Sequence, residues 1–149
     1  MLIETSRFGR IEVDDSKIMT FLEGLLGFPE SHRFALIQSS ADPVFYWLQS
    51  VDNPRLAFVV CDPRTFVPDY QVPIRKDDVD ALGLADLSDC QVMVVVNKVN
   101  DCLTANLLGP LVIGLQSLRA KQLVLSDKRY GTRHQLLDTQ PAHAVAKTA

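Results

Sequence analysis

The chain has 149 residues, of which 47 % are hydrophobic and 22 % are charged, and its formal net charge is -3. These values are typical of one folded domain with its own core, and they exclude a disordered chain. No apolar run approaches the roughly 20 residues of a membrane span, and the start, MLIETSRFGR, lacks the features of a signal peptide. We therefore expect one cytoplasmic domain without a membrane partner.

The first predicted elements are strands. The segment LIETSRFGRIEV (residues 2–13) shows two short alternating runs around a turn at Gly9, which is the pattern of a hairpin. Strands are also predicted where β-branched and aromatic residues lie between Asp, Asn and Pro turns. These are RFALIQS (33–39), FYWLQSV (45–51), LAFVVCD (56–62) and QVMVVVNKV (91–99).

The runs AFVVC and MVVV are apolar at successive positions, so both faces of these strands must be covered. The sequence therefore predicts a mostly β, single-domain, antiparallel β-barrel-like fold with one or two short helices. The clearest helix lies within residues 74–84. There Asp77 and Asp78 occupy the first turn, Val79 and Leu82 lie three residues apart, and Gly83 closes the helix.

The stretch LTANLLGPLVIG (103–114) predicts two strands joined by a bend at Gly109 and Pro110. Pro110 has no N–H to donate to a ladder, and Gly109 permits an unusual backbone. We expect the Asn106 side chain to hold this bend through hydrogen bonds to the backbone.

The aromatic run Phe45, Tyr46 and Trp47 has two interpretations. It could form a stacking platform for single-stranded nucleic acid, but such platforms interleave Lys and Arg, and this strand has neither. Alternate residues lie on opposite strand faces, so we expect core packing and a largely buried Trp47.

Nothing in the sequence indicates a catalytic, metal or cofactor site. The three cysteines have no C-x-x-C spacing and no His at ligand spacing: Cys61, Cys90 and Cys102. The three histidines lie far apart in the chain: His32, His134 and His143. EGLLGFPE has two glycines but lacks the context of a phosphate-binding loop, so we interpret Gly24 and Gly27 as turn residues.

Charge is distributed unevenly along the chain. Residues 77–101 contain six aspartates against Lys98, whereas residues 119–134 contain five basic residues against Asp127. The acidic segment is either an ordinary solvated surface or a contact for a basic partner. After Leu137 the sequence loses apolar periodicity, so we expect a domain over residues 1–137 and a mobile tail over 138–149.

Several segments in a fixed order resemble the flagellar assembly factor FliW family. They are FGRIEV, GLLGFPE, FYWLQSVDNPRLAFVVCDPRTFVPDY, LTANLLGPLVI and QLVLSDKRYGTRH. The resemblance extends from Leu2 to Leu137. It implies a non-enzymatic cytoplasmic protein that binds newly made flagellin and the translational repressor CsrA, which compete for it. When flagellin is exported, the freed protein binds CsrA and relieves its repression of flagellin mRNA.

An RNA-binding repressor presents Lys and Arg to phosphates, so an acidic surface would steer its association and repel RNA. The candidate contact residues for CsrA are therefore the densest acidic group: Asp77, Asp78, Asp80, Asp86 and Asp89. The loops around Phe28 and Tyr70 are the second candidate interface. The resemblance implies no direct contact with nucleic acid. Two alternatives stay open: an RNA-binding β-barrel, and an enzyme that uses Cys61 or a histidine.

Overall fold

The computed structural model describes residues 1–38 and 43–138. The strands before the helix are β1 (Leu2–Thr5), β2 (Gly9–Glu12), β3 (Met19–Phe21), β4 (Arg33–Gln38), β5 (Phe45–Ser50) and β6 (Ala57–Cys61). The helix is α1 (Lys76–Leu82), and the short 3-10 turns are η1 (Asp15–Lys17), η2 (Pro63–Thr65) and η3 (Leu87–Asp89). The later strands are β7 (Cys90–Val99), β8 (Cys102–Ala105), β9 (Leu111–Gly114), β10 (Arg119–Gln122) and β11 (His134–Asp138).

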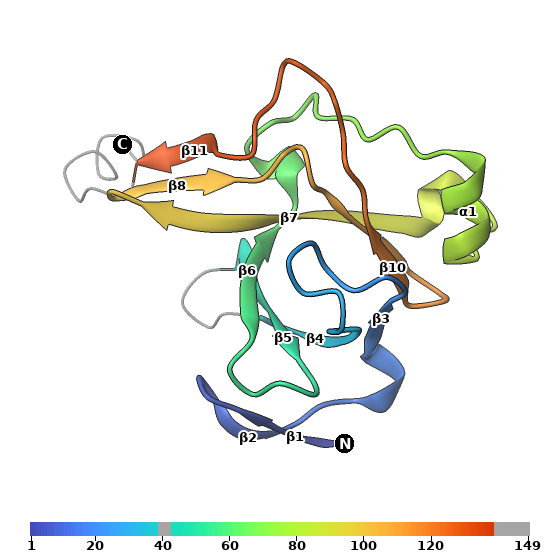
Figure 1. Cartoon of the computed structure of the whole chain (residues 1–149), viewed down its shortest axis with the longest axis vertical. Helices are drawn as coiled ribbons and strands as arrows, with labels where there is room; N and C mark the ends of the chain where they lie inside the picture. Colours follow the sequence, from blue (N-terminus) through green and yellow to red (C-terminus); the bar gives the residue numbers. More distant parts are fainter. Residues whose placement is uncertain (39–42, 139–149) are drawn as a thin grey trace.

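The strands close into a barrel. Its order is β7-β6-β5-β4-β3-β10-β9, and β9 pairs back with the first half of β7. The long strand β7 crosses the molecule in Figure 1, and its second half pairs with β8, which in turn pairs with β11. The mostly β, barrel-like prediction is confirmed. The pairing of β3 with β10 is parallel, whereas the other strand pairs of the described residues are antiparallel.

Both faces of the central strands are buried, as their apolar runs predict. Phe34, Leu48 and Val60 point into the barrel interior and are completely buried. On the outer face, Cys61 and Val94 are equally buried in a second cluster, which the segment after β6 covers. The barrel wall on this side is therefore the middle layer of the molecule.

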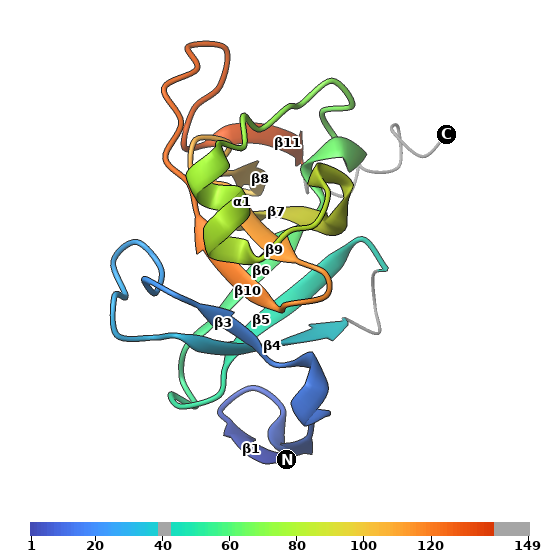
Figure 2. The same cartoon turned by 90° about the vertical axis from the view of Figure 1, so that its right-hand side faces the viewer.

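The helix forms where it is predicted. Gly83 ends α1 in the left-handed conformation with φ 63°, and its N–H bonds the carbonyls of Val79 and Asp80. Leu82 is fully buried and packs with Val112 and Leu123. Figure 2 shows α1 lying outside the barrel, over β9 and β10.

Asn106 holds the bend between β8 and β9, as expected. Its Oδ1 accepts a hydrogen bond from the backbone N–H of Leu108 at 3.1 Å, so the side chain fixes the turn. Gly109 has a different role from the predicted one, because its φ is not positive. A Cβ there would lie 2.7 Å from Asn106 Nδ2 and 2.9 Å from Gln122 Nε2, so a larger residue would have to displace these two side-chain amides.

The β1–β2 hairpin forms as predicted, as a separate two-stranded sheet whose turn packs against β5. The Arg7 guanidinium carbon lies 4.0 Å from the centroid of the Trp47 ring, and Phe8 meets the same ring edge-on at 6.1 Å. Trp47 is only half-buried, which corrects the expectation of a largely buried side chain. Its ring lies on the outer face against the hairpin turn, whereas its neighbour Tyr46 packs against the interior cluster.

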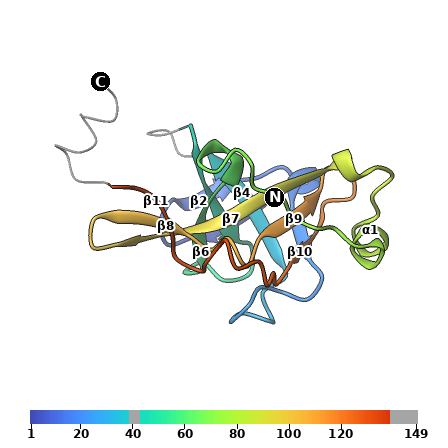
Figure 3. The same cartoon turned by 90° about the horizontal axis from the view of Figure 1, so that it is seen from above.

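The hairpin lies at one end of the long axis, and β8, β11 and α1 lie toward the other (Figures 1 and 2). Seen from above in Figure 3, β8 and β11 lie on one side of the molecule and α1 lies on the other. Asp138 is the last residue of β11, and the rest of the expected tail lies outside the described residues. Within residues 1–38 and 43–138, no helix has the length and apolar character needed to cross a membrane.

Candidate functional site

The acidic segment separates into exposed and structural carboxylates. Asp77 and Asp80 lie on α1 and are exposed, and neither side chain has a bonding partner within the described part of the chain. Asp86 is also exposed, at the start of η3. These three carboxylates are therefore available to a partner.

Asp78 serves the fold instead. It is 6 % exposed, and its carboxylate accepts hydrogen bonds from the Arg75 backbone N–H and from Lys121 Nζ, each at 3.1 Å. Burial acts to raise the pKa of this carboxyl, but the Arg75 N–H and the Lys121 ammonium outweigh it and hold the pKa below its usual value. Asp78 therefore ties α1 to β10, and its carboxylate is buried rather than exposed.

Asp86 and Asp89 also have local partners, because they cap η3. Asp86 Oδ1 accepts from the Ser88 backbone N–H at 3.0 Å, and Asp89 Oδ2 accepts from the Asp86 backbone N–H at 3.1 Å. Asp89 is half-buried. The surface available to a partner is therefore centred on α1, with Asp86 at its margin.

The second candidate interface contains one exposed and one buried aromatic residue. Phe28 is 40 % exposed, and its ring meets Phe58 edge-on at 5.4 Å. Tyr70 is 1 % exposed, its hydroxyl donates to the Leu107 carbonyl at 2.6 Å, and its ring meets that of Tyr130. Burial raises the pKa of Tyr70. The Tyr70 side chain is therefore part of the core, and the exposed aromatic residue of this candidate interface is Phe28.

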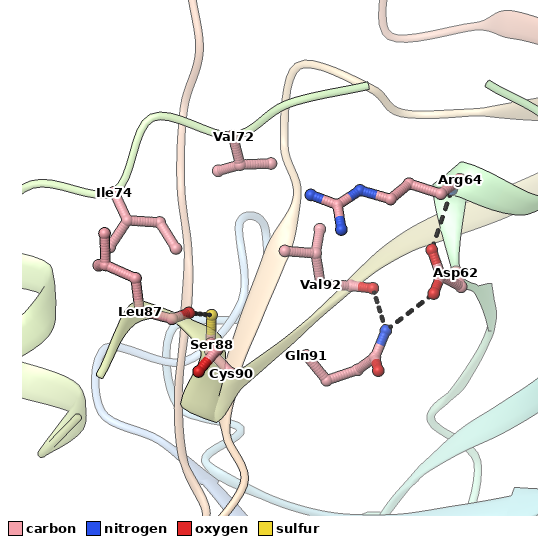
Figure 4. A pocket seen from close by; sticks show the side chains of 9 residues that line it. All are labelled: Asp62, Arg64, Val72, Ile74, Leu87, Ser88, Cys90, Gln91 and Val92. Carbon is pink, nitrogen blue, oxygen red and sulfur yellow. Dashed lines mark hydrogen bonds between the residues drawn. The ribbon is translucent and has the colours of Figure 1, made fainter. Parts of the chain in front are cut away.

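A cavity of about 490 Å³ lies between η2, η3 and the start of β7 (Figure 4). The Gln91 amide donates to Asp62 Oδ2 at 3.2 Å and to the Val92 carbonyl at 2.8 Å. These polar groups of the cavity wall are therefore hydrogen-bonded to one another. The Cys90 thiol donates to the Leu87 carbonyl at 3.2 Å. Burial raises the pKa of Cys90, and nearby Arg64 opposes this only in part, so the thiol is not activated.

The other cysteine and histidine candidates occupy structural positions. Burial raises the pKa of the Cys61 thiol to about 12, so it is protonated at neutral pH. His32 Nδ1 lies 2.8 Å from the Phe21 carbonyl oxygen, and the His134 ring lies near that of Tyr130. His143 lies outside the described residues. The described part of the chain contains no group of three or more acidic, His or Cys side chains placed to hold a metal ion.

The resemblance expected from the sequence is confirmed by comparison with known proteins. The family model described as FliW protein matches residues 2–136. The chain belongs to the FliW family. The flagellar assembly factor FliW of Bdellovibrio bacteriovorus is 37 % identical over 100 % of this chain and 86 % of its own. That of Geobacter sulfurreducens is 39 % identical over 93 % of this chain and 87 % of its own.

The FliW fold is shared as well. A crystal structure of the flagellar assembly factor FliW superposes with a TM-score of 0.83 at 33 % identity, covering 92 % of this chain and 97 % of that chain. This chain therefore has the FliW architecture over nearly its whole length, and it is a member of a family of flagellar assembly factors.

Sequence reasoning missed one feature of this FliW-family chain, a groove between β2, η1 and β4. Ile11 and Val13 are recognisable in the sequence as an alternating strand, and RFALIQ as another. No local pattern shows that part of β4 lacks a neighbouring strand, because strand pairing depends on the whole topology.

Proposed function

We propose that this chain binds cytoplasmic flagellin and the translational regulator CsrA in turn, and so relieves CsrA repression of flagellin mRNA translation. The observation that carries the proposal is its membership of the FliW family over residues 2–136, together with the shared fold. The relatives are named flagellar assembly factors, and synthesis of the filament subunit is a step that such a factor can regulate by binding.

Regulation of this kind needs only binding equilibria. If flagellin occupies the protein, CsrA is left free to repress, and removal of flagellin by export shifts the protein to CsrA by mass action. If bound flagellin weakens the affinity for CsrA by some factor, thermodynamic linkage requires bound CsrA to weaken the affinity for flagellin by the same factor. The proposal therefore requires no chemical step, which agrees with the protonated Cys61 thiol and the hydrogen-bonded Cys90 thiol.

The exposed carboxylates of α1 support a contact with CsrA. A repressor that binds RNA neutralises phosphates with Lys and Arg, so the surface around its RNA site is electropositive. Asp77 and Asp80, with Asp86 nearby, present negative charge that speeds association and repels the RNA backbone. Asp78 and Asp89 contribute indirectly, because they hold α1 and η3 in place.

The test is co-purification of this chain from the cytoplasm of its own cells, before and after export of flagellin is blocked. We expect flagellin to be retained when export is blocked and CsrA to be retained when export proceeds. Retention of neither protein, in both conditions, would refute the proposal. Steeply salt-dependent binding of purified protein to RNA would instead favour an RNA-binding barrel.

A further inference from the structure

One of the two edges of strand β4 is only partly paired. Along the fully paired edge, β5 pairs with β4 from Phe34 to Gln38. On the other side β3 pairs only with Arg33 and Phe34, and the barrel turns away after that point. Among the described residues, the second half of β4 is therefore a free sheet edge.

The backbone groups at this edge point outward. Val51 N donates to the Arg33 carbonyl at 2.9 Å, while Ser50 N is turned away from β4 and donates to the Leu56 carbonyl. Hydrogen-bonded and non-hydrogen-bonded residue pairs alternate along an antiparallel ladder. The backbone groups of Ala35 and Ile37 therefore bond β5, and those of Leu36 and Gln38 face the free edge. Within residues 1–38 and 43–138, no strand lies on that side to bond the N–H and C=O of Leu36.

An apolar groove of about 410 Å³ lies beside the free edge. The half-buried side chains of Ile11, Val13 and Ile18 line it from β2 and η1. Ile37 and the 38 % exposed Leu36 line it from β4. Figure 2 shows β4 running above the β1–β2 hairpin, at the opposite end of the molecule from α1. The groove thus offers apolar contact next to unpaired backbone groups.

The rim of the groove and the segment beside it carry a small excess of negative charge. Glu12, Asp14 and Asp15 are exposed there, against Lys17 and the amine of Met1, which lies 3.0 Å from Glu12 and 2.9 Å from Asp15. Hydrogen bonds from Ser16 lower the pKa of Asp14, so it is ionised at neutral pH. An occupant with a Lys or Arg beside its apolar residues therefore matches the rim in charge.

We propose that the free edge of β4 binds an extended segment of unassembled flagellin as an added antiparallel or parallel strand. This inference rests on the proposed function, because it names where one of the two partners binds. A filament subunit that has not polymerised exposes the apolar segments that its neighbours later cover. An added strand takes its affinity from backbone hydrogen bonds and its specificity from alternate side chains, which here enter the groove of Ile11, Val13 and Ile37.

The first test compares flagellin binding by the wild type, by Leu36→Pro and by Leu36→Glu. Proline removes an N–H that bonds none of the described strands, and it is tolerated on edge strands. We expect both variants to bind flagellin about tenfold more weakly or worse, a loss typical of removed hydrogen bonds and apolar contacts. Leu115→Glu, on an exposed leucine outside the groove, is the matched control and should bind as the wild type does.

CsrA binding, measured on the same proteins, shows whether the groove binds flagellin specifically. We expect it to be unchanged in all three variants. Loss of CsrA binding with flagellin binding retained would overturn the assignment. If the wild type binds flagellin and both Leu36 variants bind it equally well, the inference fails and the proposed function stands. If the wild type does not bind flagellin at all, both fail.

Amide hydrogen exchange on the wild type makes the test independent of variant folding. In the complex saturated with flagellin, the Leu36 amide should exchange at least about tenfold more slowly than in the free protein, because a new strand protects it. The Ala35 and Ile37 amides are already bonded to β5 and should change less. An unprotected Leu36 amide in the saturated complex would overturn the inference.

Discussion

The barrel is covered differently on its two outer sides. Over β7, the segments after β6 and after β10 bury Val94 and Val96, and the Tyr70 hydroxyl bonds the Leu107 carbonyl. Over β4 and β5, the two-stranded hairpin leaves Trp47 half-buried and Leu36 exposed beside an open groove. The first side stabilises the fold, while the second side keeps backbone and apolar groups available to a partner.

Tyr70→Ala should have the largest effect, because it empties a fully packed position on the closed side. We expect the free energy of unfolding to fall by about 3–5 kcal/mol, as for other large-to-small changes in cores. Urea titration followed by circular dichroism measures it. Tyr70→Phe keeps the ring and loses only the bond to Leu107, so it should cost less. Equal costs for Tyr70→Ala and Trp47→Ala would contradict the comparison.

Trp47→Ala should cost about 2 kcal/mol, less than a fully buried aromatic residue, because solvent already reaches part of the ring. The change removes the surface on which Arg7 and Phe8 pack. The hairpin amides should therefore exchange faster, while those of β7 should keep their protection at low denaturant. Unchanged exchange in residues 2–12 would show that the hairpin is held by other contacts.

Asp78→Asn should destabilise the protein by about 1–2 kcal/mol at neutral pH, because Lys121 loses its charged partner. The folded pKa of Asp78 lies below its usual value, so its stabilisation is present above the unfolded pKa of about 3.9 and is lost as the pH falls through the folded pKa. Thermal melts from neutral to acid pH should show the two proteins converging. Asp77→Asn, on an exposed neighbour, is the control and should follow the wild type throughout.

Reversal of charge with Asp77→Lys and Asp80→Lys should change stability least, by within about 0.5 kcal/mol, because exposed charges contribute little to folding. It should slow CsrA association at low salt and flatten the salt dependence of that rate. Stopped-flow mixing measures both. The matched control reverses the exposed carboxylates Glu4 and Asp52, which lie outside α1, η3 and the loops around Phe28 and Tyr70. Equal slowing by both pairs would mean that only net charge matters.

Local patterns predicted much of the fold. The hairpin turn at Gly9, the end of α1 at Gly83 and the bend held by Asn106 each depend on residues close together in the chain. The two-sided burial of β6 and β7 followed from their unbroken apolar runs. The parallel pairing of β3 with β10 was missed, since strands of three and four residues carry no readable pairing signal.

The candidate site was less predictable, because exposure depends on distant parts of the chain. Tyr70 lies in a Pro-containing loop segment, which is typical of surface, yet Leu107 and Tyr130 bury it. Asp78 resembles its neighbours in sequence, and its contact with Lys121, 43 residues away, cannot be read from the local pattern. The free edge of β4 likewise follows from where the barrel closes.

Partner switching is tested most directly by displacement. CsrA carrying a fluorophore is bound to this chain, flagellin is added, and fluorescence anisotropy reports release, with the reverse titration run on labelled flagellin. We expect flagellin to release CsrA and each partner to weaken the affinity for the other by the same factor. Simultaneous binding of both partners with unchanged affinities, or no binding of either, would contradict it.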